Sequence, residues 1–164
     1  MDTERKLRDV TLCFLLRGNE VLLAMKKRDF GVGRWNGFGG KRQHEDETVE
    51  RIAIRELEEE SGIVVVEAAL ERVADIDFYF AVKPEWNQHV HVFFVREWSG
   101  EPRETDEMRP QFFPIDAVPY GPEMWPEDVK WMPRIFAGEV LRGSILFKDT
   151  EGNAERIELV PVER

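Results

Sequence analysis

The chain has 164 residues, a length typical of one domain, and its 42% hydrophobic and 11% aromatic content predicts a packed core and excludes wholesale disorder. Its net charge of −10 disfavours binding to DNA, RNA and anionic membranes, but permits a small phosphorylated ligand if a cation bridges the two. The single cysteine, Cys13, excludes an intrachain disulfide, and no apolar run approaches the ~18 residues of a membrane span, so a cytoplasmic protein is expected.

The first part of the chain predicts a β-hairpin, a glycine-rich loop and a helix. Strand-forming residues occupy 10–16 and 21–25, on either side of a turn at 17–20. Five glycines within residues 31–40 make the next stretch irregular. A helical pattern then covers residues 48–61, with Asp46 or Thr48 as its N-cap and Gly62 as a left-handed residue after its end.

The rest of the chain predicts further strands and one more helix. The predicted strands are 63–70, 73–82, 89–97 and a short one at 112–115 after a polar loop at 99–109. A second helix is predicted over 127–138, where Pro133 would kink it or restart it. A closing hairpin pairs 145–148 with 156–160. Many strands with only two helices predict an α+β domain.

The helix at 48–61 places carboxylates on the face that should meet the core. At 100° per residue, one arc of this helix is apolar, formed by Val49, Ile52, Ala53 and Leu57. Glu56 and Glu60 fall within this arc and Glu59 at its edge. A solvated acidic face would lie opposite the apolar stripe. Inward-facing carboxylates repel one another unless a cation compensates them, and Mg²⁺ prefers such oxygen ligands, so the spacing favours a metal site.

The same helix resembles the Nudix box. Residues 55–63, Arg-Glu-Leu-Glu-Glu-Glu-Ser-Gly-Ile, match its ending, Arg-Glu-aliphatic-x-Glu-Glu-x-Gly-aliphatic, and Glu47 stands eight positions before Arg55 as the box requires. Gly40 stands seven positions before Glu47 where the box expects six, which indicates a one-residue insertion, and Asp46 occupies a position that is often glycine. The chain is identified as a member of the Nudix hydrolase family. This resemblance implies a Nudix fold, with a mixed β-sheet sandwiched between helices, in one domain over residues 1–164.

The resemblance also implies a metal-dependent enzyme that uses Mg²⁺, with Mn²⁺ as a substitute. The metal ligands that it implies are Gly40, Glu56, Glu59, Glu60 and Glu107. Arg55 and Glu47 would form an ion pair that orients the helix ligands. The cations would neutralise a triphosphate, polarise the phosphoryl group and lower the pKa of an attacking water. Glu56, Glu60 and a carboxylate of the 99–109 loop, Glu107 first, are the candidate acid–base residues.

Three further stretches, residues 25–41, 106–110 and 124–128, resemble animal MutT homologues, the oxidised purine nucleoside triphosphatases of the 8-oxo-dGTP diphosphatase type. The substrate contacts that this match implies are Thr11, Lys26, Phe30, Asn36, Gly39, Gly40, Phe78, Phe80, Trp125, Glu127 and Asp128. Trp125 would stack on a purine at ~1–3 kcal/mol, and Asn36 can donate to and accept from a base edge. Glu127 departs from the aspartate that is usual there. Without the resemblance, aromatic residues on a strand would indicate packing in the core. The acids at 127–128 would then indicate the first turn of a helix.

The implied reaction is hydrolysis of an oxidised purine nucleoside triphosphate, such as 8-oxo-dGTP or 2-hydroxy-dATP, to the monophosphate and pyrophosphate, which sanitises the nucleotide pool and avoids DNA damage. One alternative is another Nudix specificity: ordinary dNTPs, nucleotide sugars, dinucleoside polyphosphates or the 5′ end of RNA. A second is a catalytically silent module that binds nucleotide. The net charge disfavours RNA, and the intact glutamate set disfavours the silent module. The expected partner is a small nucleotide rather than a nucleic acid polymer or membrane, and the expected oligomeric state is a monomer.

Two other groups of reactive residues receive ordinary structural roles. The three histidines, His44, His89 and His91, show no metal-ligand spacing. His89 and His91 share one face of a predicted strand, where packing or solvent exposure is expected. Cys13 is expected to be a small core residue rather than a nucleophile.

Overall fold

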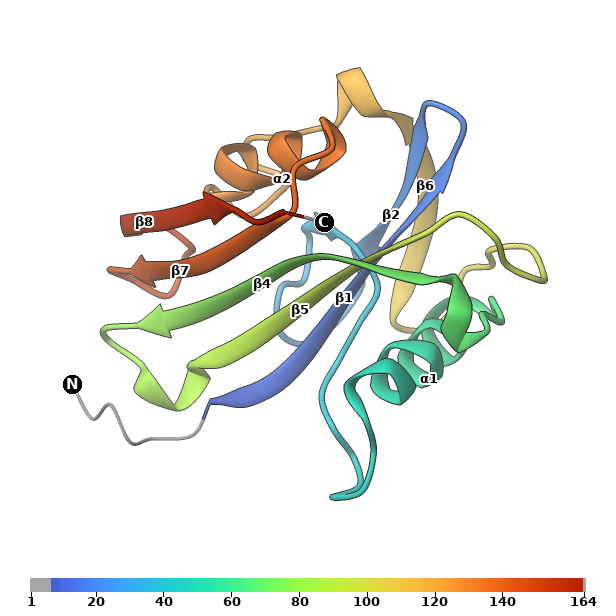
Figure 1. Ribbon diagram of the computed structural model, residues 1–164, viewed down its shortest axis with the longest axis horizontal. Helices are drawn as coiled ribbons and strands as arrows, with labels where there is room; N and C mark the ends of the chain where they lie inside the picture. Colours follow the sequence, from blue (N-terminus) through green and yellow to red (C-terminus); the bar gives the residue numbers. More distant parts are fainter. Residues whose placement is uncertain (1–6, 164) are drawn as a thin grey trace.

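The computed structural model describes residues 7–163 as an eight-stranded mixed sheet with one α-helix on each face (Figure 1). The α-helices are α1 (Val49–Ser61) and α2 (Asp128–Phe136), and the 3₁₀ turns are η1 (Glu67–Ala69), η2 (Pro84–Trp86) and η3 (Ile115–Ala117). The strands are β1 (Arg8–Arg17), β2 (Glu20–Lys26), β3 (Trp35–Asn36), β4 (Leu70–Phe80), β5 (Gln88–Val95), β6 (Met108–Pro114), β7 (Leu141–Phe147) and β8 (Ala154–Pro161). The predicted α+β architecture is confirmed.

The sheet mixes parallel and antiparallel neighbours. Its strand order is β3-β2-β1-β5-β4-β7-β8, and β6 pairs with β2. The pairs β1–β5 and β4–β7 are parallel, whereas β1–β2, β2–β3, β2–β6, β4–β5 and β7–β8 are antiparallel. The segment that follows β3 runs back along β1 through isolated bridges at Phe38 and Lys41. This pairing brings the glycine-rich loop to the centre of the sheet.

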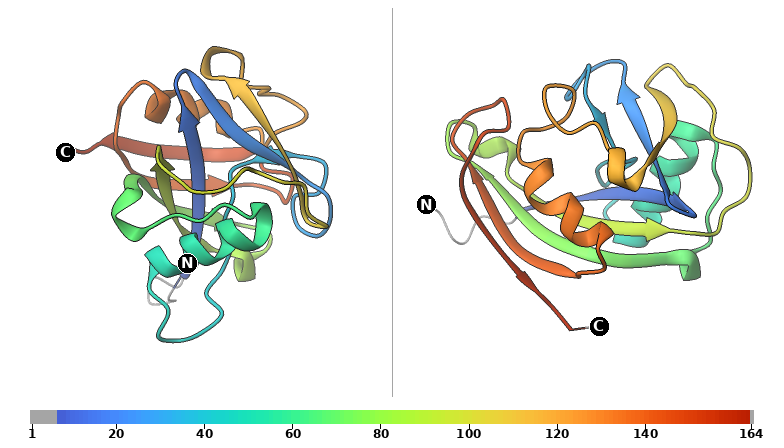
Figure 2. Two further views of the ribbon diagram at one scale, coloured as in Figure 1. Left: turned by 90° about the vertical axis from the view of Figure 1, so that its right-hand side faces the viewer. Right: turned by 90° about the horizontal axis from the view of Figure 1, so that it is seen from above.

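Two apolar clusters cover the two faces of the sheet. Because side chains alternate along β1, Cys13 and Leu15 pack with α1, while Phe14 and Leu16 belong to the cluster that contains α2. The sheet curves around α2, which lies within its concave side (Figure 2). Cys13 is fully buried and burial raises the pKa of its thiol to about 12, which confirms its role as a core residue. Among residues 7–163, no helix has the length and apolar character needed to cross a membrane.

The structure corrects four of the predicted elements; one of them is the strand predicted at 145–148, which begins earlier, because β7 spans Leu141–Phe147. The predicted strand at 63–70 is wrong: residues 63–69 contain an isolated bridge between Val64 and Ser99 followed by η1, and β4 begins at Leu70. Its β-branched residues suggested a strand, but Val64 and Val66 are exposed and have no sheet neighbour along their length. The strand predicted at 112–115 is longer, because β6 pairs with β2 from Met108 to Pro114. Helix α2 continues through Pro133 rather than restarting there.

Candidate active site

Helix α1 has caps at both ends, which fix where its side chains point. Thr48 is the N-cap, since its Oγ1 accepts from the N–H of Arg51 at 3.2 Å; Asp46, the alternative, is not. Gly62 has a left-handed φ of 80°, and its N–H donates to the carbonyl of Glu58 at 2.8 Å. The helix therefore has the predicted extent, and its last two turns carry the predicted carboxylates.

Two of the three predicted metal-binding carboxylates on α1 are turned into the protein. Glu60 is 1% exposed and the side chain of Glu56 13%, whereas that of Glu59 is 52% exposed. Burial raises the pKa of Glu60 to about 8, and the charge of Glu56 adds to this rise. Burial also raises the pKa of Glu56. Desolvated like charges one helical turn apart make this a place where a bound cation is strongly stabilised.

Gly39 and Gly40 bring the backbone after β3 against these carboxylates. The N–H of Gly39 donates to Glu60 Oε1 at 2.9 Å. A Cβ at Gly40 would lie 2.4 Å from Cδ of Glu56, and one at Gly39 would lie 1.7 Å from the carbonyl oxygen of Thr11. Only glycine fits against the backbone at position 39, and a side chain at position 40 would displace the carboxylate of Glu56. The carbonyl of Gly40 accepts from the N–H of Thr11 at 3.0 Å and, at a longer 3.5 Å, from the Oγ1 of Thr11.

Arg55 connects the carboxylates on α1 to the loop that precedes the helix. Its guanidinium binds both oxygens of Glu47, at 2.6 and 3.1 Å, and donates to Glu56 Oε1 at 2.7 Å and Glu59 Oε2 at 3.4 Å. The hydrogen bond from Arg55 holds the pKa of Glu47 at about 2. The extra residue ahead of Glu47 is accommodated in the 41–48 loop, which leaves this ion pair intact. The network fixes the position of Glu56.

A cavity of about 430 Å³ adjoins this cluster at Gly39 and Gly40 and extends to the start of α2. Its volume is within the range of small-ligand sites. All the residues predicted as substrate contacts line it: Thr11, Lys26, Phe30, Asn36, Gly39, Gly40, Phe78, Phe80, Trp125, Glu127 and Asp128. The carboxylate cluster and the predicted base pocket are therefore neighbouring parts of one site.

Two adjacent acids at the α2 end of the cavity are buried without complete hydrogen bonding. Glu127 is 4% exposed and Asp128 2%, and Glu127 Oε2 and Asp128 Oδ2 have no hydrogen-bond partner within the described residues. Burial raises the pKa of Glu127 to about 7 and that of Asp128 well above its usual range. Burial therefore favours the protonated form of each carboxyl group, and a protonated carboxyl group offers a ligand a donor as well as an acceptor.

Aromatic side chains form the walls of the cavity. Phe30 stacks on Trp125 with ring centroids 5.2 Å apart, and the guanidinium of Arg34 lies 3.9 Å from the Trp125 ring. Phe80 stacks on Phe147 at 4.7 Å. Several lining residues were not singled out from the sequence, among them Arg34, Trp86, Gln88, Met108, Trp131 and Phe147. Their residue types suit core or turn positions equally well, so no sequence signal marked them.

Glu107 lies near the cluster, although it is not among the described residues that line the cavity. Its side chain is 42% exposed, and its Oε1 accepts from Arg28 Nη2 at 3.3 Å. Besides burial, its negative charge is one of the smaller causes that raise the pKa of Glu56 and Glu60. The 99–109 loop is attached to the end of α1 by Thr105, whose Oγ1 donates to the carbonyl of Glu60 at 3.1 Å.

The candidate metal-ligand atoms of this cluster fit a hard divalent cation. All of them are oxygens: the carboxylates of Glu56, Glu59 and Glu60 and the carbonyl of Gly40. Burial raises the pKa of Glu56 and Glu60, and a bound cation would offset this effect by stabilising the ionised carboxylates. Mg²⁺ and Mn²⁺ suit such a set because they bind a few carboxylates and keep other positions for water and phosphate oxygens.

Two curated proteins resemble this chain over most of its length. The oxidized purine nucleoside triphosphate hydrolase of Mus musculus is 45% identical over 141 residues, which cover 86% of this chain and 87% of the mouse protein. The protein of the same description from Danio rerio is 44% identical over 139 residues, which cover 85% of this chain and 86% of the zebrafish protein.

Solved structures and the family comparison agree with this similarity. The MutT protein of Bacillus halodurans superposes with a TM-score of 0.78 at 24% identity, covering 93% of this chain and 97% of its own. A MutT NUDIX hydrolase of Burkholderia pseudomallei gives a TM-score of 0.64 at 27% identity, covering 80% and 96%. The NUDIX domain family matches residues 6–135. The chain therefore belongs to the Nudix family.

Proposed function

We propose that this Nudix protein hydrolyses oxidised purine nucleoside triphosphates, of the 8-oxo-dGTP and 2-hydroxy-dATP type, to the monophosphate and pyrophosphate in the presence of Mg²⁺. One observation carries the proposal: a single cavity adjoins the α1 carboxylates at one end and two buried, incompletely hydrogen-bonded acids at the other. The first end suits a polyphosphate with its cation and the second suits a base edge. The two relatives described as oxidized purine nucleoside triphosphate hydrolases support the substrate class.

The residues of the cluster have separate tasks in this reaction. Glu56, Glu59 and Glu60 would hold Mg²⁺, which supplies charge neutralisation of the triphosphate and a lower pKa for the attacking water. Arg55 keeps Glu56 in place, and the two glycines allow phosphate to approach the backbone. The water oxygen bonds to the α- or the β-phosphorus while the bond from that phosphorus to the bridging oxygen breaks, so the bridging oxygen leaves with pyrophosphate or with the monophosphate, respectively. Glu56, Glu60 and Glu107 are the candidate acceptors of the water proton.

The buried acids provide a physical basis for selecting an oxidised base. In 8-oxoguanine, N7 carries a hydrogen and C8 carries an oxygen, whereas guanine has an acceptor at N7. Burial raises the pKa of both Glu127 and Asp128, and with one of the two protonated the pair can accept from an N–H and donate to a carbonyl. Trp125 and Phe78 supply apolar surface for the ring. Guanine bound by the same N7–C8 edge would leave one of these buried polar atoms unpaired.

A substrate panel tests the proposal. Pyrophosphate release with Mg²⁺ would be measured for 8-oxo-dGTP, 2-hydroxy-dATP, dGTP and ADP-ribose. We expect kcat/KM for at least one oxidised triphosphate to exceed that for dGTP by about tenfold or more, because a site that hydrogen-bonds a substrate group discriminates against analogues without it. Equal rates for dGTP, or a preference for ADP-ribose, would overturn the substrate assignment.

A further inference from the structure

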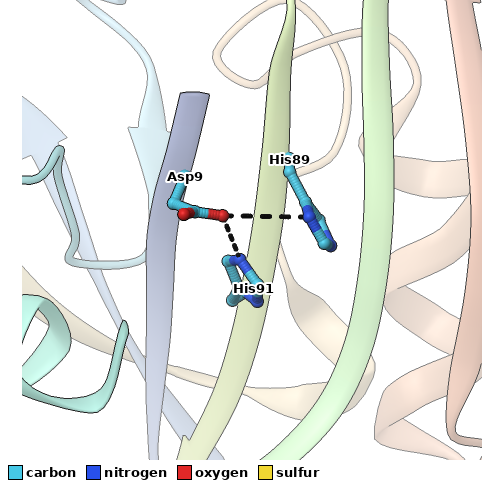
Figure 3. A group of neighbouring side chains, drawn as sticks. All are labelled: Asp9, His89 and His91. Carbon is cyan, nitrogen blue, oxygen red and sulfur yellow. Dashed lines mark hydrogen bonds and ion pairs between the residues drawn. The ribbon is translucent and has the colours of Figure 1, made fainter. Parts of the chain in front are cut away.

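A second group of metal-ligating side chains lies outside the cavity, on the face of the sheet that carries α1. Asp9 of β1 faces His89 and His91 of β5 (Figure 3). The two strands are parallel, with Asp9 paired to His89 and Thr11 paired to His91, so the carboxylate and both imidazoles share one face. The histidine spacing alone gave no indication of this group, because its third member is 82 positions from His91.

We propose that Asp9, His89 and His91 form a binding site for a transition-metal ion of the Zn²⁺ class, separate from the carboxylate cluster on α1. Their ligand atoms all lie within 4.8 Å of one another. Asp9 Oδ1 is 2.9 Å from His91 Nε2 and 3.8 Å from His89 Nδ1. A tetrahedral Zn²⁺ requires ligand atoms about 3.3 Å apart, a value between these two. Two imidazoles with one carboxylate suit Zn²⁺, Co²⁺ or Ni²⁺ better than Mg²⁺.

The hydrogen bonding of His89 favours a cation beside Asp9. His89 Nε2 is hydrogen-bonded to Asp75 Oδ1, and an ionised carboxylate only accepts, so Nε2 carries the hydrogen. In the neutral ring, the lone pair of Nδ1 is then left on the side of the Asp9 carboxylate. Two facing acceptors repel, and either a proton on Nδ1 or a metal ion between the two atoms removes this repulsion. Asp75 would orient the ring from its outer side, as carboxylates do for metal-bound histidines.

His91 is engaged differently, and Arg72 is the reason. Arg72 Nη1 lies 2.6 Å from His91 Nδ1 and can only donate, so His91 Nε2 carries the hydrogen and donates to Asp9. Coordination through Nε2 requires the hydrogen to move to Nδ1 and Arg72 to turn away. Glu50 offers Arg72 another partner, with Oε1 3.5 Å from Nη2. Arg72 therefore competes with the metal for His91.

The surroundings leave room for the remaining ligands of the ion. Arg42 binds Asp9 Oδ2 at 2.6 Å, which leaves Oδ1 for coordination. Asp9 and His89 also line a cavity of about 760 Å³, whose wall holds both arginines and further carboxylates: Arg142, Arg156, Asp75, Asp77 and Glu158. Water or a small anion can reach the ion from this cavity and complete a tetrahedral set.

Cobalt titration tests the site directly. Tag-free protein in excess Mg²⁺, which occupies the α1 carboxylates, would be titrated with Co²⁺ and followed by visible absorption. We expect one equivalent to bind, with about 100-fold weaker affinity in His89→Ala and His91→Ala and about tenfold weaker affinity in Asp75→Asn. Arg72→Leu keeps every ligand and removes the competitor, so its affinity should be higher than that of the wild type. His44→Ala removes an exposed histidine that is not part of this group, so it is the matched control. This variant should bind Co²⁺ with the affinity of the wild type.

Two results would overturn the proposal. One is the absence of Co²⁺ binding in excess Mg²⁺, in the wild type and in Arg72→Leu alike. The other is binding that survives in His89→Ala and His91→Ala but disappears in Glu59→Gln, which would place the ion at α1. Circular dichroism spectra of each variant would show whether it folds. If a histidine variant does not fold, the Co²⁺ affinity of Arg72→Leu still tests the site.

Discussion

Replacing Glu59 with glutamine is expected to lower kcat for an oxidised purine triphosphate by about 10³-fold, a loss of about 4 kcal/mol of transition-state stabilisation. The change removes one negative ligand from the cation and keeps the size of the side chain. Because Glu59 is 52% exposed, the variant should fold with nearly normal stability. Initial-rate measurements over a range of Mg²⁺ concentrations would check the loss, together with a thermal melt to verify folding.

Glu58→Gln is the matched control for this variant. Glu58 is the neighbouring residue on α1, is exposed, and lies on the other side of the helix from the inward carboxylates. It loses the same charge, so a general electrostatic effect would change both variants alike. A Glu59→Gln enzyme that keeps more than a tenth of the wild-type kcat, or an equal loss in Glu58→Gln, would contradict the assignment of Glu59 as a metal ligand.

Replacing Arg55 with methionine is expected to lower the free energy of unfolding at pH 7 by about 3 kcal/mol, because it leaves a buried carboxylate without its partner. Glu47 has an 8% exposed side chain and receives two hydrogen bonds from Arg55, at 2.6 and 3.1 Å. Urea unfolding would measure the change. Arg51→Met, an exposed position four residues earlier on the same helix, should change stability by less than about 0.5 kcal/mol.

The same variant has a defined pH dependence. Arg55 lowers the pKa of Glu47 from 4.5 to about 2, so the stability that this pair contributes is fully present above pH 4.5 and is lost as the pH falls toward 2. The difference in free energy of unfolding between Arg55→Met and the wild type should therefore become smaller as the pH falls from 4.5 toward 2. A difference that stays constant from pH 7 to pH 3 would show that the ion pair is not its cause.

The α1 carboxylates were predictable from sequence because they depend on local geometry. The 100° periodicity of one helix places Glu56 and Glu60 with the apolar residues, and the structure buries both. The helix caps are local in the same sense, since Thr48 and Gly62 act on their own helix ends. The substrate-contact residues of the cavity wall were predicted from the resemblance to MutT homologues rather than from periodicity.

Features that depend on strand register or on long-range packing could not be predicted. Trp86 and Phe147 reach the cavity from a 3₁₀ turn and from β7, and nothing in their local sequence separates them from ordinary core residues. Asp9 meets His91 only because β1 and β5 pair in one particular parallel register. The strand prediction for residues 63–70 was wrong for the converse reason. Its β-branched residues have strand propensity, but a strand also requires a neighbouring strand to pair with.

A crystal structure with Mn²⁺ and a non-hydrolysable purine triphosphate would test most directly whether the α1 carboxylates hold a polyphosphate through a divalent cation. We expect an anomalous peak at about 2.0–2.2 Å from carboxylate oxygens of α1, Glu56 among them, with phosphate oxygens on its other side and the base beside Glu127 and Asp128. Mn²⁺ bound only at a distance from α1, or a nucleotide outside this cavity, would contradict the account.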